Sequence, residues 1–313
     1  MPNELIITIT MNPAIDKSAR VDKLVPEAKL RCTAVKNEPG GGGINVSKAL
    51  NRLGMGSTAI FPAGGHNGNM LQDLLKNEKI SFSAIPVTGE TRENFIILEI
   101  STNNQYRFNI QAAALSETEA GHCLETVSNL YPKPSIIVAS GSLPGGIPPG
   151  FYAALAKWAA SQSARFILDT SGTPLHLAVN ESIYLLKPNL SELRQLTGMN
   201  DLTKADVVTA AQQLINRHNI EMIVVSLGAE GAVLITREYH EYVAAPEVKK
   251  QSTVGAGDSM VAGMVYMLAL QKSPVEMIRF GVACGTAATM NPGTELFHLA
   301  DVKKLYEQLY PTL

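Results

Sequence analysis

The sequence of 313 residues lacks several motifs that would each point directly to a function. It has no GxxxxGK[ST] segment and no Gly-Lys pair, which excludes a P-loop nucleotide site. No GxGxxG segment follows a predicted strand, which disfavours a dinucleotide-binding site of the Rossmann type. HExxH and GxSxG are also missing, which excludes the corresponding metalloprotease and serine-hydrolase sites.

Cysteine is scarce. The chain has 3 cysteines (Cys32, Cys123 and Cys284), and they are far apart in sequence with no CxxC pair. This excludes the usual paired-cysteine zinc and dithiol motifs and predicts reduced thiols in a cytoplasmic protein.

Strong charge and long apolar runs are lacking too. The net charge is −2, which disfavours nucleic acid as a partner because nucleic-acid-binding domains usually carry a basic patch. The first apolar run, in MPNELIITIT, is too short and too poor in basic residues for a signal peptide. The most apolar long stretch, residues 135–156, is interrupted by glycine and prolines, so it does not predict a membrane span. We therefore expect a cytoplasmic protein without a membrane partner.

Short apolar, β-branched runs alternate with helical patterns along most of the chain, and 45% of the residues are apolar. Strands are predicted at 5–10, 58–61, 136–140, 166–169, 183–187 and 222–226. Helices are predicted at 42–53, 70–77, 117–130, 151–161, 205–217, 257–270, 275–290 and 301–309. This alternation predicts an α/β fold with a doubly wound, mostly parallel sheet and helices on both faces.

Two regions interrupt the alternation and are predicted to form a small antiparallel sheet. Residues 18–36 and 94–110 contain short stretches that alternate apolar and polar side chains. We expect one domain spanning residues 1–313, with these strands inserted as a lid at about 17–36 and 91–111.

A run of glycines opens the first predicted helix, in the segment EPGGGGINV at residues 38–46. Without Cβ atoms at Gly41 and Gly42, a ligand could approach the backbone closely. Free N–H groups at a helix start favour an anion or sugar hydroxyls, and Asn45 lies one turn inside the helix. The alternative is a tight turn that only packs.

A second glycine-rich segment, QSTVGAGDS at residues 251–259, also precedes a helix. The backbone amides that follow Gly255, at Ala256, Gly257 and Asp258, could form an anion hole. Asp258 alone could be an ordinary helix-start residue. A carboxylate beside an anion hole, however, suits phosphoryl transfer to a hydroxyl, because it can orient that hydroxyl and accept its proton.

The segments GGGGINVSKAL and TVGAGDSMVAG resemble the two signatures of the PfkB, or ribokinase-like, carbohydrate kinase family. Between them SGSLP, KPNLSE and SLGAEG follow in the family's order, and the resemblance covers the chain from Leu5 onward. It implies a small β-sheet lid that often forms a dimer interface, with Asp258 as catalytic base and Gly255 to Gly257 as the anion hole.

The resemblance also assigns residues to the nucleotide. It implies ATP contacts at Lys187, Asn189, Ser226, Gly228 and Gly231. Glu192 completes an NxxE pattern that organises Mg²⁺ through water. From the residues alone, Glu192 could be an exposed first-turn residue and Lys187 a solvated strand end.

Further matches lie on the sugar side. The resemblance implies sugar contacts at Asp16, Lys29, Gly41, Gly42, Asn45 and Ser142. Arg92 and Arg107 flank the second lid region, and two arginines suit a phosphate already present on the sugar. The alternative is that both arginines are solvated charges on the lid with no role in binding.

The implied activity is ATP-dependent phosphorylation of a phosphosugar, with fructose 6-phosphate expected to give fructose 1,6-bisphosphate in glycolysis. KLRCTA, EPGGGG and QSTVGAGDS are most similar to the minor bacterial 6-phosphofructokinases. At Gly42 the 1-phosphofructokinases and tagatose-6-phosphate kinases, the open alternatives, typically have lysine. A non-catalytic sugar or nucleotide sensor is disfavoured because the base and the glycines are intact.

Two further expectations follow from the family. Some members bind a monovalent cation beside the anion hole, and the matching positions for K⁺ are Ser252, Val254, Ala288, Asn291 and Gly293. A homodimer through the lid strands is expected as well.

Overall fold

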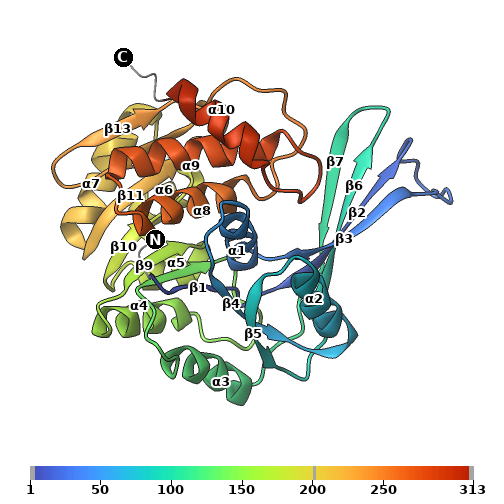
Figure 1. Cartoon of the computed structure of the whole chain (residues 1–313), viewed down its shortest axis with the longest axis horizontal. Helices are drawn as coiled ribbons and strands as arrows, with labels where there is room; N and C mark the ends of the chain where they lie inside the picture. The colour runs from blue at the N-terminus through green and yellow to red at the C-terminus, as the bar shows by residue number, and fades with distance from the viewer. Residues whose placement is uncertain (1–3, 200–201, 310–313) are drawn as a thin grey trace.

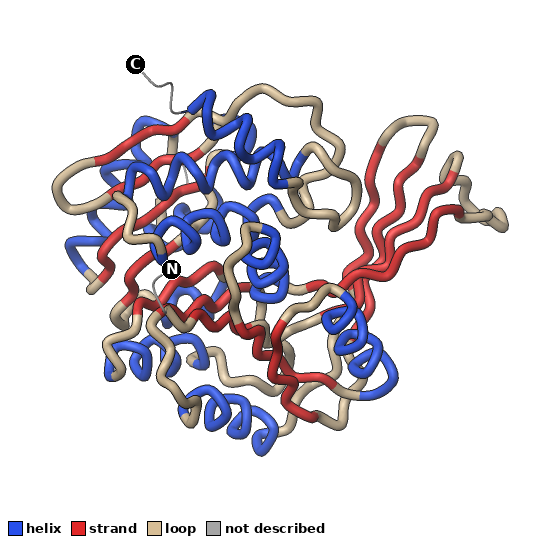
Figure 2. Tube along the Cα trace, in the orientation of Figure 1, coloured by secondary structure: helices blue, strands red, loops and turns tan. Residues whose placement is uncertain are grey.

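A computed structural model describes residues 4–199 and 202–309. The chain forms a large sheet covered by helices on both faces, and a smaller sheet projects from one side of this body (Figures 1 and 2). In the described part of the chain, no helix is both long and apolar enough to cross a bilayer.

The large sheet has nine strands in the order β13-β12-β11-β10-β9-β8-β1-β4-β5. Its strands are β1 (Ile6–Ile9), β4 (Thr58–Ala63), β5 (Ser81–Pro86), β8 (Ile136–Ser140), β9 (Arg165–Asp169), β10 (Ile183–Leu186), β11 (Ile220–Ser226), β12 (Ala232–Ile235) and β13 (His240–Val243). All pairs from β5 to β11 are parallel, and only β12 and β13 are antiparallel to their neighbours. The mostly parallel sheet predicted from the sequence is confirmed.

Helices cover both faces of this sheet because successive strand residues point to opposite sides. Ile6 and Ile136 pack with α1 (Gly42–Arg52), α8 (Ala256–Ala269), α9 (Pro274–Thr289) and α10 (Leu299–Leu309). Ile7 and Ile137 pack against the opposite layer, formed by α3 (Glu117–Ser128), α4 (Phe151–Ser161), α5 (Gly172–Ala178), α6 (Leu190–Thr197) and α7 (Val207–Arg217). The remaining helices are α2 (Gly65–Asn77), η1 (Lys204–Asp206) and η2 (Gly228–Glu230).

The small sheet consists of β2 (Ala14–Val21), β3 (Thr33–Gly40), β6 (Arg92–Glu99) and β7 (Asn104–Asn109), in the order β3-β2-β6-β7. Its outer pairs, β2–β3 and β6–β7, are antiparallel as expected. The central pair β2–β6 is parallel, so the expectation of a purely antiparallel sheet is wrong at this pair. The reason is topological: the chain returns to the body through α1, β4, α2 and β5, and it enters the small sheet again from the same end.

The two faces of the small sheet differ in chemistry. The register places Phe95 opposite Phe108 and Ile97 opposite Tyr106 on its outer face, where Phe108 is 50% exposed. Neighbouring positions alternate to the inner face, which looks toward the body. A cavity of about 360 Å³ separates that inner face from the loops around Gln251 and Gly293.

Candidate active site

Polar side chains gather where the parallel strands of the large sheet end. β8, β9 and β11 end in Ser140, Asp169 and Ser226, and Lys187 directly follows β10. The strand order reverses at β1, because the chain moves from β1 to β4 on one side and later to β8 on the other. In open α/β sheets, ligands bind at the carboxyl ends of strands near such a reversal. The geometry therefore places a binding site at this edge.

The helix α8 points its N-terminus at the same edge. Gly255 precedes it in the left-handed conformation, with φ +72°, and no side chain caps the first turn. An added Cβ at Gly257 would lie 3.7 Å from Lys187 Nζ and 4.0 Å from Asp169 Oδ2. The first-turn amides thus lie beside a lysine in a helix start that favours an anion.

Asp258 lies in this first turn and is held on both carboxylate oxygens. Asn45 Nδ2 donates to Oδ2 at 3.0 Å, and the Ser140 hydroxyl donates to Oδ1 at 3.3 Å. Burial and the nearby Asp169 carboxylate raise the pKa of Asp258, whereas Asn45, Lys187 and Ser140 lower it. The resulting pKa is about 6. Asp258 is therefore oriented as a proton acceptor near neutral pH.

Lys187 forms a buried ion pair beside Asp258. Its Nζ lies 3.1 Å from Asp169 Oδ1, and the Lys187 side chain is 6% exposed. Burial lowers the pKa of Lys187, but the attraction of Asp169, Glu192 and Asp258 outweighs it and the net pKa is raised. Lys187 is thus a fixed cation, and the sequence-based alternative of a solvated strand end does not apply.

Asn189 and Glu192 form the capping box of α6. Asn189 N–H donates to Glu192 Oε2 at 2.8 Å, and Glu192 N–H donates to Asn189 Oδ1 at 2.9 Å. Burial raises the pKa of Glu192, and the nearby Asp169 carboxylate raises it further, against hydrogen bonds from Asn189. Glu192 is half-buried, so the alternative of an exposed first-turn residue is wrong, and its other carboxylate oxygen lies outside the capping box.

Asp169 and Glu192 fit a hydrated Mg²⁺. Mg²⁺ is commonly bound by one or two carboxylates together with water and substrate phosphates. The described residues contain no group of three or more His, Cys, Asp and Glu side chains that could hold a metal by themselves. These two carboxylates would therefore share the ion with phosphate and water.

The predicted nucleotide loop follows β11, next to the end of β10. Ser226 N–H donates to Pro188 O at 3.0 Å, and Leu227 N–H donates to Gly231 O at 2.8 Å. Gly228 has a φ of +65° and nothing within 4 Å of an added Cβ, so this part of the loop is open.

The glycines before α1 fit closely against the end of β8. A Cβ at Gly42 would overlap the Ser140 hydroxyl and lie 3.0 Å from Gly141 N, and Gly41 has a φ of +116°. These glycines let α1 begin where Asn45 reaches Asp258. Asn45 Oδ1 is buried and has no hydrogen-bond partner among the described residues, so it can accept a hydrogen bond from a ligand hydroxyl.

Asp16 lies on the inner face of the small sheet. Asn94, its cross-strand neighbour on β6, donates to Asp16 Oδ1 at 2.8 Å. Burial raises the pKa of Asp16, and Glu38 raises it further, while Asn94, Lys48 and Arg92 lower it. Next to Asp16, Arg92 donates to Asn94 Oδ1 at 3.1 Å and its Nε is buried without a partner in the described chain.

Arg107 extends from the inner face of β7 and reaches the loop before α8. Its NH2 group donates to Thr253 Oγ1 at 2.8 Å. Ser142 accepts a hydrogen bond from Asn12 Nδ2 at 3.0 Å, and Asn12 O accepts one from Arg92 at 3.2 Å. Asn12 thus brings Ser142 and Arg92 together, whereas the contact of Arg107 is with the loop before α8.

Lys29 is the exception. It lies on the exposed connection between β2 and β3. This connection is at the end of the small sheet farthest from the body (Figure 1). None of the hydrogen bonds and ion pairs given above for the described residues of the site involves Lys29.

The loops proposed for a monovalent cation lie side by side. The Ser252 hydroxyl donates to Gly293 O at 2.9 Å and accepts from Val254 N–H at 3.1 Å. Asn291 Nδ2 donates to Leu296 O at 2.9 Å, and Asn291 N–H donates to Ala288 O at 3.3 Å. The Asn291 side chain therefore holds its own loop, and ligands for a cation would be backbone carbonyls and the Ser252 hydroxyl.

Sequence reasoning missed several residues of this site. Asp169 and Ser140 each end a predicted strand, and this common position was the signal that could have identified them. Asn94 and Asn12 had no such signal, because their contacts depend on the parallel pairing of β2 with β6 and on a loop.

Comparison with known proteins identifies the family. The model of the pfkB family carbohydrate kinases matches residues 3–299. The chain belongs to the pfkB family. It is 43% identical over 305 residues to the ATP-dependent 6-phosphofructokinase isozyme 2 of Escherichia coli K12, covering 97% of this chain and 98% of that one. The predicted carbohydrate kinase is thereby confirmed.

Other pfkB proteins are similar at greater distance. A 1-phosphofructokinase of Bacillus subtilis is 32% identical over 295 residues, which is 94% of this chain and 96% of the relative. A ribokinase structure from Arabidopsis thaliana, 20% identical, superposes with a TM-score of 0.76 over 97% of this chain and 99% of that one, which supports the ribokinase-like fold.

Solved structures of the Escherichia coli phosphofructokinase-2 resemble the whole chain. Its complex with potassium has a TM-score of 0.93 and 42% identity, covering 98% of this chain and 99% of that one. The same enzyme has also been solved with fructose-6-phosphate and in a tetrameric inhibited form.

Proposed function

We propose that this chain is an ATP-dependent 6-phosphofructokinase that converts fructose 6-phosphate to fructose 1,6-bisphosphate. The observation that carries the proposal is the position of Asp258. It lies between the helix start beside Lys187 and the sugar-side glycines, with Asn45 linking it to α1. Arg92 and Arg107, on the inner face of the small sheet, supply two cations for the phosphate already on the sugar.

In this mechanism the sugar's free primary hydroxyl donates its proton to Asp258. The hydroxyl oxygen forms a bond to the terminal phosphorus of ATP as the bond between that phosphorus and the bridging oxygen breaks, and ADP leaves. The amides after Gly255 and the Lys187 ammonium stabilise negative charge on the transferring group. Asn45 holds Asp258 and offers its free Oδ1 to a sugar hydroxyl.

Glu192 and Asp169 would hold Mg²⁺, which neutralises phosphate charge when bound. Lys187 keeps Asp169 oriented toward the phosphates. A monovalent cation between the loops of Ser252 and Gly293 is part of the same proposal. It is supported by the convergence of these loops and by the potassium complex of the Escherichia coli relative.

A homodimer through the outer face of the small sheet is also proposed. Phe95, Ile97, Tyr106 and Phe108 present apolar surface there, and a second copy of the chain would bury it. Lys29, distant from its own chain's site, would act in this arrangement on the site of the second copy. The cytoplasmic location expected from the sequence belongs to this proposal.

The test is steady-state kinetics with ATP and four acceptors: fructose 6-phosphate, tagatose 6-phosphate, fructose 1-phosphate and fructose. We expect the highest kcat/KM with fructose 6-phosphate. Tagatose 6-phosphate should follow within roughly tenfold, because one hydrogen bond is worth only about 1 kcal/mol. Fructose 1-phosphate as the best substrate would assign the chain to the 1-phosphofructokinases instead.

Arg92→Ala and Arg107→Ala provide the matched variants. Each should raise KM for fructose 6-phosphate by roughly tenfold or more, since charged hydrogen bonds to phosphate are lost, and leave KM for ATP unchanged. Lys133→Ala, at an exposed cation on the body, is the control. An unchanged sugar KM in both arginine variants would refute the phosphate site.

A further inference from the structure

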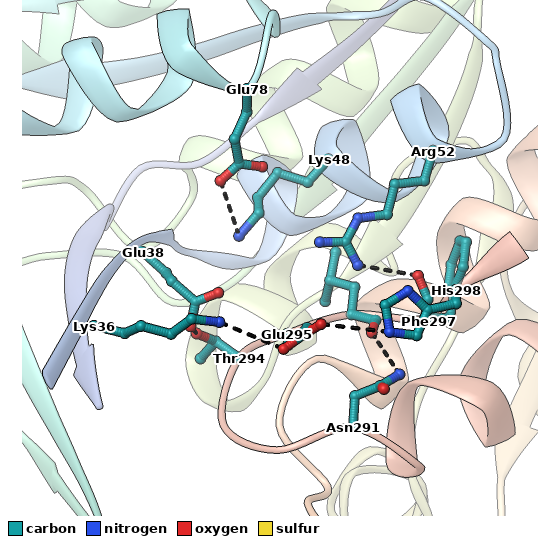
Figure 3. A network of polar contacts seen from close by, with 11 residues as sticks. Lys36, Glu38, Lys48, Arg52, Glu78, Asn291, Thr294, Glu295, Phe297 and His298 are labelled. Atoms are coloured by element: carbon teal, nitrogen blue, oxygen red, sulfur yellow. Dashed lines mark hydrogen bonds and ion pairs between the residues drawn. The ribbon is translucent and has the colours of Figure 1, made fainter. Parts of the chain in front are cut away.

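One lysine is buried where no part of this mechanism uses it. Lys48 lies on α1 and is 1% exposed. Its Nζ donates to Pro39 O at 3.1 Å. It also lies 3.8 Å from Glu78 Oε1, whose side chain is 36% exposed (Figure 3). Burying an ammonium group is costly, so a lysine at a fully covered helix position calls for a compensating role.

The contacts of Lys48 lead to the sugar side of the site. Pro39, whose carbonyl it holds, immediately precedes Gly40, and a Cβ at Gly40 would overlap the Asp16 carboxylate. Lys48 therefore supports the end of β3, against which Asp16 packs. Asn45, one turn earlier on the same helix, holds Asp258.

The charged neighbours of Lys48 also connect it with the sugar side of the site. Asp16 on β2, Glu38 on β3 and Glu78 at the end of α2 are the acids facing it, and Arg52 on α1 is the neighbouring cation. Asp16 has Lys48 and Arg92 as its cationic neighbours, with Glu38 acting against them. Without Lys48, Asp16 and Glu38 would lose a cation that both of them face, and Asp16 would keep Arg92.

We propose that Lys48 is a positioning residue for sugar binding: its buried ammonium holds the end of β3 at Pro39–Gly40 and compensates the charge of the Asp16 carboxylate. The inference rests on the proposed function, since it concerns the acceptor sugar. It assigns Lys48 no contact with the substrate. Its effect should therefore be seen in the affinity for the sugar and not in the nucleotide site.

The experiment compares Lys48→Gln, Lys48→Arg and Glu78→Gln with the wild type. Lys48→Gln keeps a hydrogen-bond donor and removes the charge, so we expect KM for fructose 6-phosphate to rise at least about tenfold, with KM for ATP unchanged and kcat within about threefold. Lys48→Arg should recover most of the sugar affinity. Glu78→Gln removes the half-exposed ion-pair partner and should leave both KM values unchanged.

Two outcomes would overturn the proposal. In one, Lys48→Gln binds the sugar as the wild type does. In the other, Glu78→Gln reproduces the full loss, which would reduce Lys48 to a link between α1 and α2. A wild type that does not phosphorylate fructose 6-phosphate would instead refute the proposed function, so the two failures are distinguishable.

The wild type gives a second measurement should Lys48→Gln not fold. Burial lowers the pKa of Lys48, although Glu78, Glu38 and Asp16 oppose the shift. A lowered pKa means that this charge is lost, as pH rises into the alkaline range, before that of an exposed lysine is lost. KM for fructose 6-phosphate should rise there while KM for ATP stays constant, and a constant sugar KM up to pH ~10 would contradict the proposal.

Discussion

At the residue scale, the chemistry of Asp258 comes from its neighbours more than from its place in a helix. A carboxylate in the first turn of an exposed helix is stabilised in its ionised form. Asp258 departs from this because it is desolvated and lies near Asp169, and its pKa is about 6. Asn45 and Ser140 fix the direction in which it accepts a proton.

The first prediction is a pH profile. A raised pKa means that Asp258 gains a proton as pH falls through about 6, so kcat/KM for the sugar should decline below that pH. Asp169→Asn removes the neighbouring negative charge that raises this pKa, so in that variant the acidic decline should move to lower pH. A profile without a decline between pH 7 and pH 5 would contradict the assignment of Asp258 as base.

The sequence predicted part of this site. Asp258, Asn45 and Lys187 could be named because they lie in or near glycine-rich or strand-end motifs. The pairing of Lys187 with Asp169 could not be predicted, because it depends on two strands 18 positions apart along the chain lying side by side in the sheet.

At the scale of elements, the glycine turn before α1 and the helix start of α8 form the site from opposite ends of the sequence. The turn before α1 is tight because atoms of β8 and its loop lie against Gly42. A side chain at Gly42 would have to displace Ser140, which itself holds Asp258.

The second prediction concerns this turn. Gly42→Ala should lower kcat/KM for the sugar at least tenfold and decrease the free energy of unfolding by about 1–3 kcal/mol, the usual cost of overpacking. Gly56→Ala is the control, since nothing lies within 4 Å of its added Cβ. Kinetics and urea unfolding of both variants give the comparison. Wild-type kinetics in Gly42→Ala would mean that the backbone shifts to accommodate the added methyl group, and that this turn does not position the residues of the site.

Most elements of the body were predictable from periodicity, and some were not. The six predicted strands are present in the parallel sheet because continuous apolar runs are typical of strands buried on both faces. The strand β5 was missed because SFSAIP has a weak pattern, and the hairpin β12–β13 because its second strand is short and polar. The parallel pairing of β2 with β6 could not be predicted from either segment alone, since it follows from the path of the chain between them.

At the scale of the whole molecule, the small sheet has one face on the active site and the other toward solvent. The outer face carries Phe95, Tyr106 and Phe108, which are 37%, 38% and 50% exposed. A two-faced sheet of four strands that projects from the body would gain stability from a partner on its apolar side.

The third prediction is therefore about association. Phe108→Asp should convert the proposed dimer to monomers, because it places a charge in the proposed apolar interface. Tyr131→Asp is the control, since Tyr131 is 92% exposed but lies on the body, away from the small sheet. Light scattering coupled to size exclusion measures both. A wild type that is monomeric and fully active at assay concentration would refute the dimer.

The most direct test of the central claim is kcat of Asp258→Asn with ATP and fructose 6-phosphate. The substitution keeps the shape of the side chain and removes the proton acceptor, so kcat should fall by ~10²–10⁴-fold. Both KM values should stay within a few-fold. Asp301→Asn makes the same change in the first turn of α10 and should leave kcat unaltered. If kcat of Asp258→Asn stayed within about threefold of the wild type, Asp258 would not be the base and the proposed mechanism would be wrong.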